Sequence, residues 1–509
     1  MPVFATYALA VDWDNNGNFT GAQDDITGDV LEVGCDAGRD YASWLTGRAT
    51  AGLLTAKLDN DSGKYNSFNT ASPITGLIKP RRPVRLQATS VTTVTLWQGF
   101  LDTIEPEVSP GGVRIAMLRA IGSLGVVNQR QVSVAMKTSI LTGTAIGDVL
   151  DEIGWPAGDR TIDAGQTTMA RWFTGGTVQS LTALHDIEES EAGLVREGKD
   201  AKIIFEDRHH RLKAPHTVSQ ATYSDAASPT IGYIQVQQQD PLREIYNIIE
   251  AQFQKYTTGA LAILWTHVEA TSSPASVISL APGASFTVWA SYPNPQSAAN
   301  ARAVDAWTTP VASTDFLANS AADGTGTDLT ASIAVVATKF DTAMKLVWTN
   351  NHATSVAYFT LMQARGTPVT ADDPVNIKSE DTTSQTAYGE RTYTNPAKFL
   401  PSSAQARDWA DFTLSIYKDP IPVNRVSIVA NKDAAHMAEV LNRDVSDRVT
   451  LIANNLSKLG INEDFFVEHI SHRIVARLHV MSVELSPASA YGGFWTLGLS
   501  ALGSAKLAY

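Results

Sequence analysis

Residues 84–100 read Val84-Arg-Leu-Gln-Ala-Thr-Ser-Val-Thr-Thr-Val-Thr-Leu-Trp-Gln-Gly-Phe100. Short runs in which apolar residues alternate with polar ones, or follow one another, occupy both ends of this segment, at Val84–Ala88 and Val94–Phe100. Alternation with a period of two residues places one face of a strand on a core and the other in water. The segment therefore predicts two β-strands, and it makes a mainly β fold class the first hypothesis for the chain.

The same pattern continues on both sides of this segment. Residues 1–128 contain further alternating or apolar runs, separated by turn-forming clusters of Asn, Asp, Gly and Pro. The runs include Tyr7–Val11, Val30–Val33 and Val113–Leu118, and the turn clusters include residues 15–18, 61–63 and 110–112. Strands at this spacing usually close into a barrel or sandwich, so residues 1–128 are predicted to form a first β-barrel.

The spacing becomes helical after about residue 128. Apolar residues recur every three or four positions in two segments, and Gly154 and Pro156 end the first of them. The apolar members are Ile146, Val149, Leu150 and Ile153 in the first segment, and Val178, Leu181, Leu184 and Ile187 in the second. The predicted outer face of the second helix carries Glu188, Glu189 and Glu191, and its predicted C-cap is Gly193. With a strand at 201–205, residues 129–222 predict a small α/β domain.

The remaining chain returns to strands, interrupted by an island of different composition and by one helix. The island is poor in charged residues and rich in Ala, Thr, Ser and Val, which predicts an inserted β-sandwich. A helix with Ser402 or Ser403 as its N-cap follows, and it is predicted to complete the α/β domain. The predicted boundaries are 223–261 for the start of a second β-barrel, 262–375 for the sandwich, 376–421 for the helical return segment and 422–509 for the rest of the second barrel.

Composition bounds the class of protein. The chain has 509 residues and a formal net charge of −13, and its 44% hydrophobic and 18% charged residues suit packed domains and exclude wholesale disorder. No apolar run approaches the roughly 18 residues of a membrane-spanning helix. Cys35 is the only cysteine, which excludes an intrachain disulfide and a cysteine-rich zinc site. The acidic balance argues against a surface that grips nucleic acid, and it suits a wall past which DNA slides.

The sequence contains no recognised catalytic motif. It has no zinc-protease HExxH helix, no Gly-x-Ser-x-Gly nucleophile elbow and no phosphate-binding loop. Carboxylate pairs occur, and a glycosidase needs two carboxyl groups across a cleft. These pairs include Glu105 with Glu107 and Asp24 with Asp25. Two histidine pairs are interpreted as structural, because His209 and His210 follow a predicted strand in a solvated turn, and His469 and His472 lie on opposite faces of a strand.

One acidic loop has the spacing of a calcium site. Oxygen-bearing side chains stand at alternate positions around Gly17, which permits the sharp bend that such a loop needs. The candidate ligands are Asp12, Asp14, Asn16, Asn18 and Asp24. The twelfth position is Gln23 where a bidentate Glu is expected, and Asp and Asn also close ordinary hairpin turns with their own side chains. A structural calcium ion and a plain turn are both consistent with the loop, and no other cofactor is expected.

The insert is rich in aromatic residues. Trp289, Tyr292 and Trp307 are the candidate contacts for a glycan or a receptor, because aromatic rings stack on sugars. The alternative is that these rings form the core of the sandwich.

A series of short motifs along the chain gives a family resemblance. In the first half they are Val11-Asp-Trp-Asp-Asn-Asn-Gly17, Asp24-Asp-Ile-Thr27, Leu58-Asp-Asn-Asp-Ser-Gly-Lys64, Lys79-Pro-Arg-Arg-Pro-Val-Arg85 and Leu96-Trp-Gln-Gly-Phe-Leu-Asp102. In the second half they are Ser384-Gln-Thr-Ala-Tyr-Gly-Glu-Arg391, Asp447-Arg-Val-Thr450, His469-Ile-Ser-His472 and Phe494-Trp-Thr-Leu-Gly498. In this order they resemble the minor tail proteins of long-tailed bacteriophages, the baseplate or tail-tip hub proteins. The resemblance covers roughly residues 1–250 and 376–500 and leaves out the insert.

The resemblance implies two tail-tube-like β-barrels joined by smaller domains, with three copies forming a ring that continues the tail tube and surrounds the DNA exit. The implied partners are two further copies of the chain, a distal tail protein or tail tube above, tip, fibre or tape-measure proteins below and inside, and viral DNA that passes without specific binding. The implied location is the tail tip of the virion, after synthesis in the host cytoplasm. Many hub proteins carry a domain that degrades the cell wall, and because this chain ends at Tyr509 that enzyme is expected on another chain.

The sequence hypothesis is therefore a non-enzymatic tail hub whose insert decorates the tip or touches the host surface. Two alternatives stay open. The first is a surface or adhesion protein that binds carbohydrate through the inserted β-sandwich. The second is a tail-associated glycosidase that uses a carboxylate pair outside the known motifs.

Overall fold

The computed structural model describes residues 2–39, 48–108, 111–226, 231–239, 245–268, 277–292, 301–395, 399–400, 402–420, 423–491, 494–495 and 506–507. Strands dominate this part of the chain, so the predicted mainly β fold class is confirmed. Parts of two predicted features, the turn cluster at 110–112 and the motif at 494–498, lie outside the described residues. No helix in the described ranges is long and apolar enough to cross a membrane.

The N-terminal part is a curled antiparallel sheet with the order β1-β5-β6-β7-β4-β2. Its strands are β1 (Thr6–Val11), β5 (Pro83–Thr89), β6 (Thr93–Val108), β7 (Arg114–Ile121), β4 (Leu53–Asp59) and β2 (Val30–Arg39). The two strands predicted within residues 84–100 lie in β5 and β6, which pair from Pro83 opposite Phe100 to Thr89 opposite Thr93. The alternation that predicts them also holds for burial, because Val84, Leu86 and Ala88 are buried and their neighbours are not.

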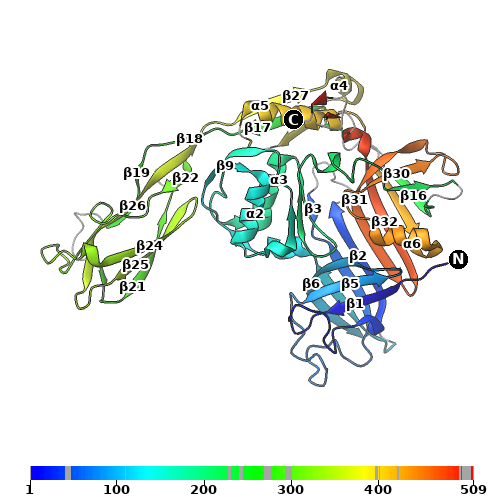
Figure 1. Ribbon diagram of the computed structural model, residues 1–509, viewed down its shortest axis with the longest axis horizontal. Coiled ribbons are helices and arrows are strands. Elements are labelled where there is room, and N and C mark those ends of the chain that lie inside the picture. The colour runs from blue at the N-terminus through cyan, green and yellow to red at the C-terminus, as the bar shows by residue number, and fades with distance from the viewer. Residues whose placement is uncertain are drawn as a thin grey trace.

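The C-terminal strands continue this sheet directly. From β2 the order runs on through β31 (Ile461–Val475), β32 (Leu478–Pro487), β29 (Val423–Val429) and β16 (Gln235–Gln239). The junction is antiparallel and places Cys35 of β2 opposite His472 of β31. Off this path, β3 (Ala49–Thr50) pairs with β2, and β30 (Arg448–Ala453) joins β31 to β15 (Ala221–Ser224). Strands from both ends of the chain therefore form one sheet, and helix α6 (Ala434–Asn442) packs beside its C-terminal half (Figure 1).

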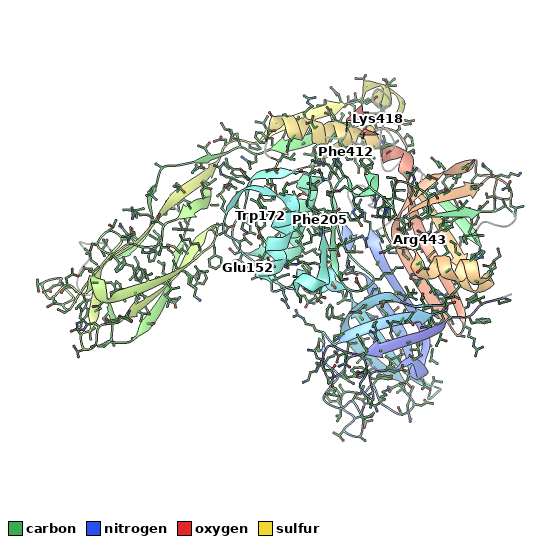
Figure 2. The ribbon with its side chains drawn as sticks, viewed as in Figure 1. Glu152, Trp172, Phe205, Phe412, Lys418 and Arg443 are labelled. Atoms are coloured by element: carbon green, nitrogen blue, oxygen red, sulfur yellow. The ribbon has the colours of Figure 1, made fainter. Side chains whose placement is uncertain are left out.

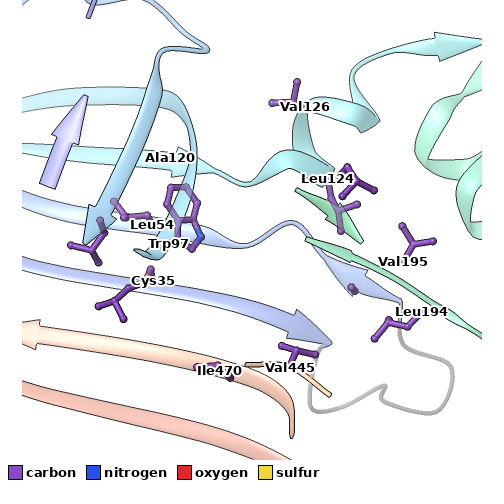
Figure 3. Packing of buried hydrophobic residues seen from close by; sticks show 14 of the residues in the cluster. Cys35, Leu54, Trp97, Ala120, Leu124, Val126, Leu194, Val195, Val445 and Ile470 are labelled. Carbon is purple, nitrogen blue, oxygen red and sulfur yellow. The ribbon is translucent and has the colours of Figure 1, made fainter. Parts of the chain in front are cut away.

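The α/β unit sits against the middle of this sheet. Helices α2 (Thr142–Glu152) and α3 (Ser180–Glu191) pack beside a small sheet of order β10-β14-β13, formed by β10 (Arg160–Ile162), β14 (Ile203–Glu206) and β13 (Leu194–Glu197). Two short ladders complete it, in which β11 (Thr168–Trp172) pairs with β9 (Lys137–Leu141) and β12 (Val178–Gln179) pairs with β8 (Gln131–Val132). Figure 3 shows part of the core that the α/β unit and the sheet share, in which Leu194 and Val195 of β13 and Leu124 of helix α1 (Ser123–Asn128) belong to one buried cluster with Trp97 of β6 and Val445 of the turn before β30.

The prediction for the outer face of the second helix was wrong for two of its three glutamates. Glu188 and Glu191 of α3 are buried, at 5% and 0% exposure. Glu191 accepts hydrogen bonds from the Thr142 hydroxyl and from the backbone N–H groups of Gln166 and Thr167. These carboxylates accept hydrogen bonds from backbone N–H groups outside the helix. Helical periodicity alone assigns the same carboxylates to solvent.

A third unit lies above the α/β unit and differs from the predicted boundaries. Strand β17 (Ile248–Phe253), assigned from sequence to the second barrel, pairs instead with β27 (Val375–Glu380) and β28 (Thr392–Asn395). Helix α5 (Ser403–Tyr417) packs on this three-stranded sheet, and its N-cap is Ser402, as predicted, whose side chain accepts the Gln405 N–H. Lys418, after α5, donates to Asp381, the N-cap of the short helix α4 (Thr382–Tyr388) (Figure 2). The return segment thus completes a unit built on β17.

The insert projects away from the other units (Figure 1). The 15-residue strand β26 (Ala357–Ala371) organises one sheet, and β25 (Ala343–Asn350) is the centre of the other. The partners of β26 are β18 (Tyr256–Thr258), β19 (Ala262–Val268), β20 (Ile278–Leu280), β22 (Ala301–Trp307) and β23 (Phe316–Asn319), and those of β25 are β21 (Ser285–Ser291) and β24 (Ile333–Lys339). The two sheets enclose a separate core around Trp348 and Phe359.

Candidate functional site

The outer face of the continuous sheet is the largest feature with a regular chemistry. In β4, Leu54, Ala56 and Leu58 point into the core, so Leu53, Thr55 and Lys57 lie on the opposite face. The register carries this face across the junction, where Asp36 of β2 stands opposite Ser471 of β31. It continues through Ser482 of β32 and Ser427 of β29, whose hydroxyls are 2.8 Å apart, to Gln235 of β16. Along this row, from Asp36 to Gln235, the side chains carry hydroxyl, amide and carboxylate groups.

Charges of both signs occur on this face. Glu32 of β2 accepts from Arg473 of β31 at 2.8 Å, and Lys57 and Arg119 lie on the neighbouring strands β4 and β7. A shallow hollow of about 520 Å³ follows the junction and is lined by residues that include Glu32, Asp36 and Arg473. The hypothesis of a DNA-repelling wall needs an excess of carboxylates, whereas this face has alternating charges among hydroxyl and amide groups.

A buried ionic network joins the α/β unit to the C-terminal half of the sheet. Arg211 binds Glu468 with two hydrogen bonds of 2.5 and 2.8 Å, and it also donates to the Ser446 hydroxyl. That hydroxyl donates to Glu206, which accepts from Arg196. Burial alone would raise the pKa of Glu468, but Arg211 outweighs it and lowers this pKa to about 2. The network therefore stays ionised and fixes the two units to each other.

The first histidine pair follows strand β14 in a turn, as interpreted, but both histidines are half-buried, so the turn is only partly solvated. Glu206 and Asp207 are buried, at 2% and 4% exposure. His210 lies 2.8 Å from Asp163 through Nδ1. Burial lowers the pKa of His210, but the hydrogen bond with Asp163 and the negative charges of Glu206 and Asp163 together outweigh burial and leave the pKa raised. Across the described ranges, no three His, Cys, Asp or Glu side chains gather as a metal site would require.

The second pair lies on opposite faces of β31, as interpreted from the sequence, because the strand pairs regularly with β32 from His469 to His472. His472 is buried and lies 3.0 Å from Nε2 of His479, whose Nδ1 lies 2.9 Å from the Tyr7 hydroxyl. This chain of polar groups links β31 and β32 to β1 of the N-terminal half. Burial lowers the pKa of His479 to about 4 and that of His472 well below its ordinary value, so both rings are neutral near pH 7.

The acidic loop has the geometry of the hairpin-turn alternative. The two carboxylate oxygens of Asp12 accept the backbone N–H groups of Asn16 and Gly17, and Asp24 accepts that of Gly21. The remaining members hydrogen-bond within the loop, Asp14 with the Asn16 amide and Asn18 with Thr20. Backbone donors thus occupy oxygens that a calcium ion would need, and calcium binding at Asp12, Asp14, Asn16, Asn18 and Asp24 stays a prediction.

The three candidate glycan residues gather around one turn of the insert. Trp289 is 50% exposed and stacks on Phe340, with ring centroids 5.6 Å apart. Trp307 is only 4% exposed and donates its indole N–H to the Phe340 carbonyl, so its ring belongs to the core. Tyr292 is half-buried and packs against the same core. Of the three, Trp289 presents the most open surface to a ligand.

The turn after Phe340 also attaches the insert to the α/β unit. Asp341 is fully buried, and its Oδ2 accepts the Thr174 hydroxyl at 2.8 Å and the N–H groups of Gly175 and Gly176 at 2.6 and 3.2 Å. Gly175 and Gly176 have φ values of +75° and +110°, which only glycine adopts without strain and which aim successive N–H groups at one anion. We refer to this contact as the Asp341 clasp. This contact was not predicted from the sequence, although the Gly175-Gly176 pair is a local signal of a backbone turn that can bind an anion.

No protein-family model matches the chain, and no curated protein matches it. Among solved structures, it is similar to the prophage MuSo2 43 kDa tail protein from Shewanella oneidensis, with 8% identity, 95% of this chain and 99% of that chain covered, and a TM-score of 0.48. A tail protein from Neisseria meningitidis MC58 gives 8% identity, coverage of 96% and 98%, and a TM-score of 0.48. The prophage tail protein gp18 from Listeria monocytogenes EGD-e gives 9% identity, 96% of both chains and a TM-score of 0.40. These descriptions agree with the family that the sequence motifs resemble, and no residue role is carried over from them.

Proposed function

We propose that this chain is a structural, non-enzymatic protein of a phage tail tip, and that three copies form a ring whose channel is lined by the outer face of the continuous sheet. The observation that carries the proposal is that face, because one largely polar surface runs from β7 and β4 through β2 and β31 to β16. An antiparallel sheet can leave one face in water. A channel for a passing polyanion needs a wetted wall without a continuous positive surface, and hydroxyl and amide side chains between charges of both signs support that role.

The ordered tail-hub motifs of the sequence support the same proposal. In this arrangement the ring connects the proteins above it, a tail tube or a distal tail protein, with the proteins below and inside it, which are tip, fibre or tape-measure proteins. The insert lies at the periphery, where the exposed Trp289 face can contact the host surface or a neighbouring tip protein. The location is the tail tip of the virion.

The first test is the mass and shape of the purified full chain. The expected result is a native mass of three times the 54.6 kDa chain, with a ring and a central channel in negative-stain images. A monodisperse monomer at all concentrations, together with its absence from rings in tail particles, would overturn the proposal. It would favour the carbohydrate-binding alternative.

The glycosidase alternative has its own test. Glu105 and Glu107 are exposed on one strand, and Asp24 is engaged with a backbone N–H, so neither pair faces another carboxylate across a cleft. The purified chain is therefore expected to leave cell walls intact in a turbidity assay. Clearing that disappears when one carboxylate is replaced by its amide would establish the enzyme instead.

A further inference from the structure

A cleft of about 350 Å³ lies where the insert meets the α/β unit and the unit of β17. All three parts contribute to its wall. The lining residues used below are Phe173, Asp186, Gln252, Tyr256, Arg302 and Phe399. Clefts between domains are a preferred place for ligands, and this volume is within the range of small-molecule sites.

Aromatic rings form one part of the wall. Phe173 packs edge-to-face on Tyr256, with centroids 5.3 Å apart, and on Phe399, with centroids 6.2 Å apart. Phe173 and Phe399 are buried, whereas Tyr256 is half-buried. Tyr256 therefore keeps part of its ring open, and the buried Phe173, which itself packs on Phe399, holds it in place.

Hydrogen-bonding groups form the rest of the wall. Within the described ranges, the Tyr256 hydroxyl and the Gln252 side-chain amide have no hydrogen-bond partner, and both residues are only half-buried. Asp186 and Arg302 add one charge of each sign, so the lining has no net charge. The nearby N–H groups of Gly175 and Gly176 are directed at Asp341, so they are not available to a phosphate. The wall matches a neutral ligand with several hydroxyl groups and one apolar face.

The cleft is fixed before any ligand binds. The Asp341 clasp holds residues 174–176 of the wall, and Arg171 donates to the Tyr256 carbonyl at 3.3 Å and to the Thr258 hydroxyl at 2.5 Å. A wall held in this way loses little conformational entropy when a ligand binds. This improves the binding free energy of ligands that make only weak polar contacts.

We propose that this cleft binds a saccharide, with a sugar ring on the Tyr256 ring and with sugar hydroxyl groups hydrogen-bonded to the Tyr256 hydroxyl, Gln252, Asp186 and Arg302. Aromatic rings that contact the apolar face of a sugar, together with planar polar groups that pair with its hydroxyls, give such sites their specificity. The site is distinct from the exposed Trp289 face, and it does not require the ring.

The test uses the full chain on an array of bacterial surface oligosaccharides, followed by calorimetry with the strongest binder. Gln252→Ala and Tyr256→Phe each remove one group that no other side chain uses, so both variants should fold, which thermal unfolding checks. Each is expected to weaken binding about tenfold, the value of one hydrogen bond in a sheltered site. The matched control is Trp289→Ala, which should keep the affinity within about twofold.

Three outcomes would overturn the proposal: no oligosaccharide on the array binds, the two cleft variants bind as the wild type does, or Trp289→Ala alone abolishes binding. Because binding is measured whatever the oligomeric state, its failure would leave the ring intact. A monomer that binds sugar through the cleft would reject the ring and keep this site.

Discussion

At the scale of single residues, the buried histidines make stability depend on pH. The pKa of His479 is about 4 in the folded chain because of burial, against an ordinary value of 6.5. Between these values the unfolded chain binds more protons, so stability must fall as the pH drops from 6.5 towards 4. A shift of this size corresponds to about 3 kcal/mol, all of it present above pH 6.5. Urea unfolding at pH 7.5 and pH 5 is expected to show about 2 kcal/mol of this loss, because the full loss is reached only below pH 4, and His479→Asn should reduce it. The exposed His267 is the control, and an equal effect of His267→Asn would refute the assignment.

The second residue-scale prediction concerns Glu468. Its replacement by Gln removes the negative charge that makes two hydrogen bonds with the buried Arg211. Breaking a buried pair in this way costs about 3–5 kcal/mol of unfolding free energy. Glu463, exposed on the same strand β31, provides the matched control, and Glu463→Gln should change stability by less than about 0.5 kcal/mol. Chemical denaturation measures both, and similar values for the two variants would contradict the role given to the network.

At the scale of elements, the Asp341 clasp is expected to hold the insert in one orientation. Asp341→Asn keeps the shape of the side chain but removes the charge that strengthens its three hydrogen bonds to residues 174–176. Hydrogen exchange at the Gly175 and Gly176 amides should accelerate at least about tenfold, because each charge-assisted bond contributes about 1.5–3 kcal/mol. Asp323→Asn, in an exposed turn of the same insert, should leave these amides unchanged. Unchanged exchange in Asp341→Asn as well would mean that other contacts hold the insert.

The elements also show which part of the structure was predictable. Strands β5 and β6 and the N-cap Ser402 follow from local alternation and local hydrogen bonding, and both were predicted. Strand β17 was recognised as a strand but assigned to the wrong sheet, because period-two alternation does not specify a partner. Glu188 of α3 was placed in solvent, since helical spacing cannot show that strand β13, 7 residues further on, donates the Val195 N–H to it. Both errors concern partners outside the element itself.

In the candidate sites too, local patterns were predictable from the sequence and the partners of each residue were not. The aromatic residues of the insert were found by composition, yet the cleft depends on Phe173, Gln252 and Phe399, which come from three separate segments. Trp307 was a candidate surface contact with the core as the alternative, because a tryptophan in a strand has the same sequence pattern whether it points in or out. Only the register of β22 on β26, together with the indole hydrogen bond to Phe340, decides that it is buried.

At the scale of the whole molecule, the pairing of β2 with β31 is the contact on which the proposed channel depends, because it joins residues more than 400 positions apart into one face. If that face lines the channel, positive charge added to it must act on DNA from three sides at once. Gln235 and Gln237 of β16 are exposed and stand opposite Ser427 and Arg425, so Gln235→Lys with Gln237→Lys adds six charges to a ring.

At low salt, rings of this variant are expected to bind a short DNA duplex at least about tenfold more strongly than wild-type rings. The difference should fall steeply as salt is added, because each lysine–phosphate contact releases bound counterions. Electrophoretic mobility of purified rings measures the retention. The control places the same two charges on the insert, as Val336→Lys with Thr338→Lys, on a strand where both residues are exposed. Charges inside a channel are focused by its walls, whereas charges on the periphery are screened within about 10 Å. Equal retention by the two variants would place the outer face of the sheet on the outside of the assembly, and the channel wall would then have to be formed by another part of the chain.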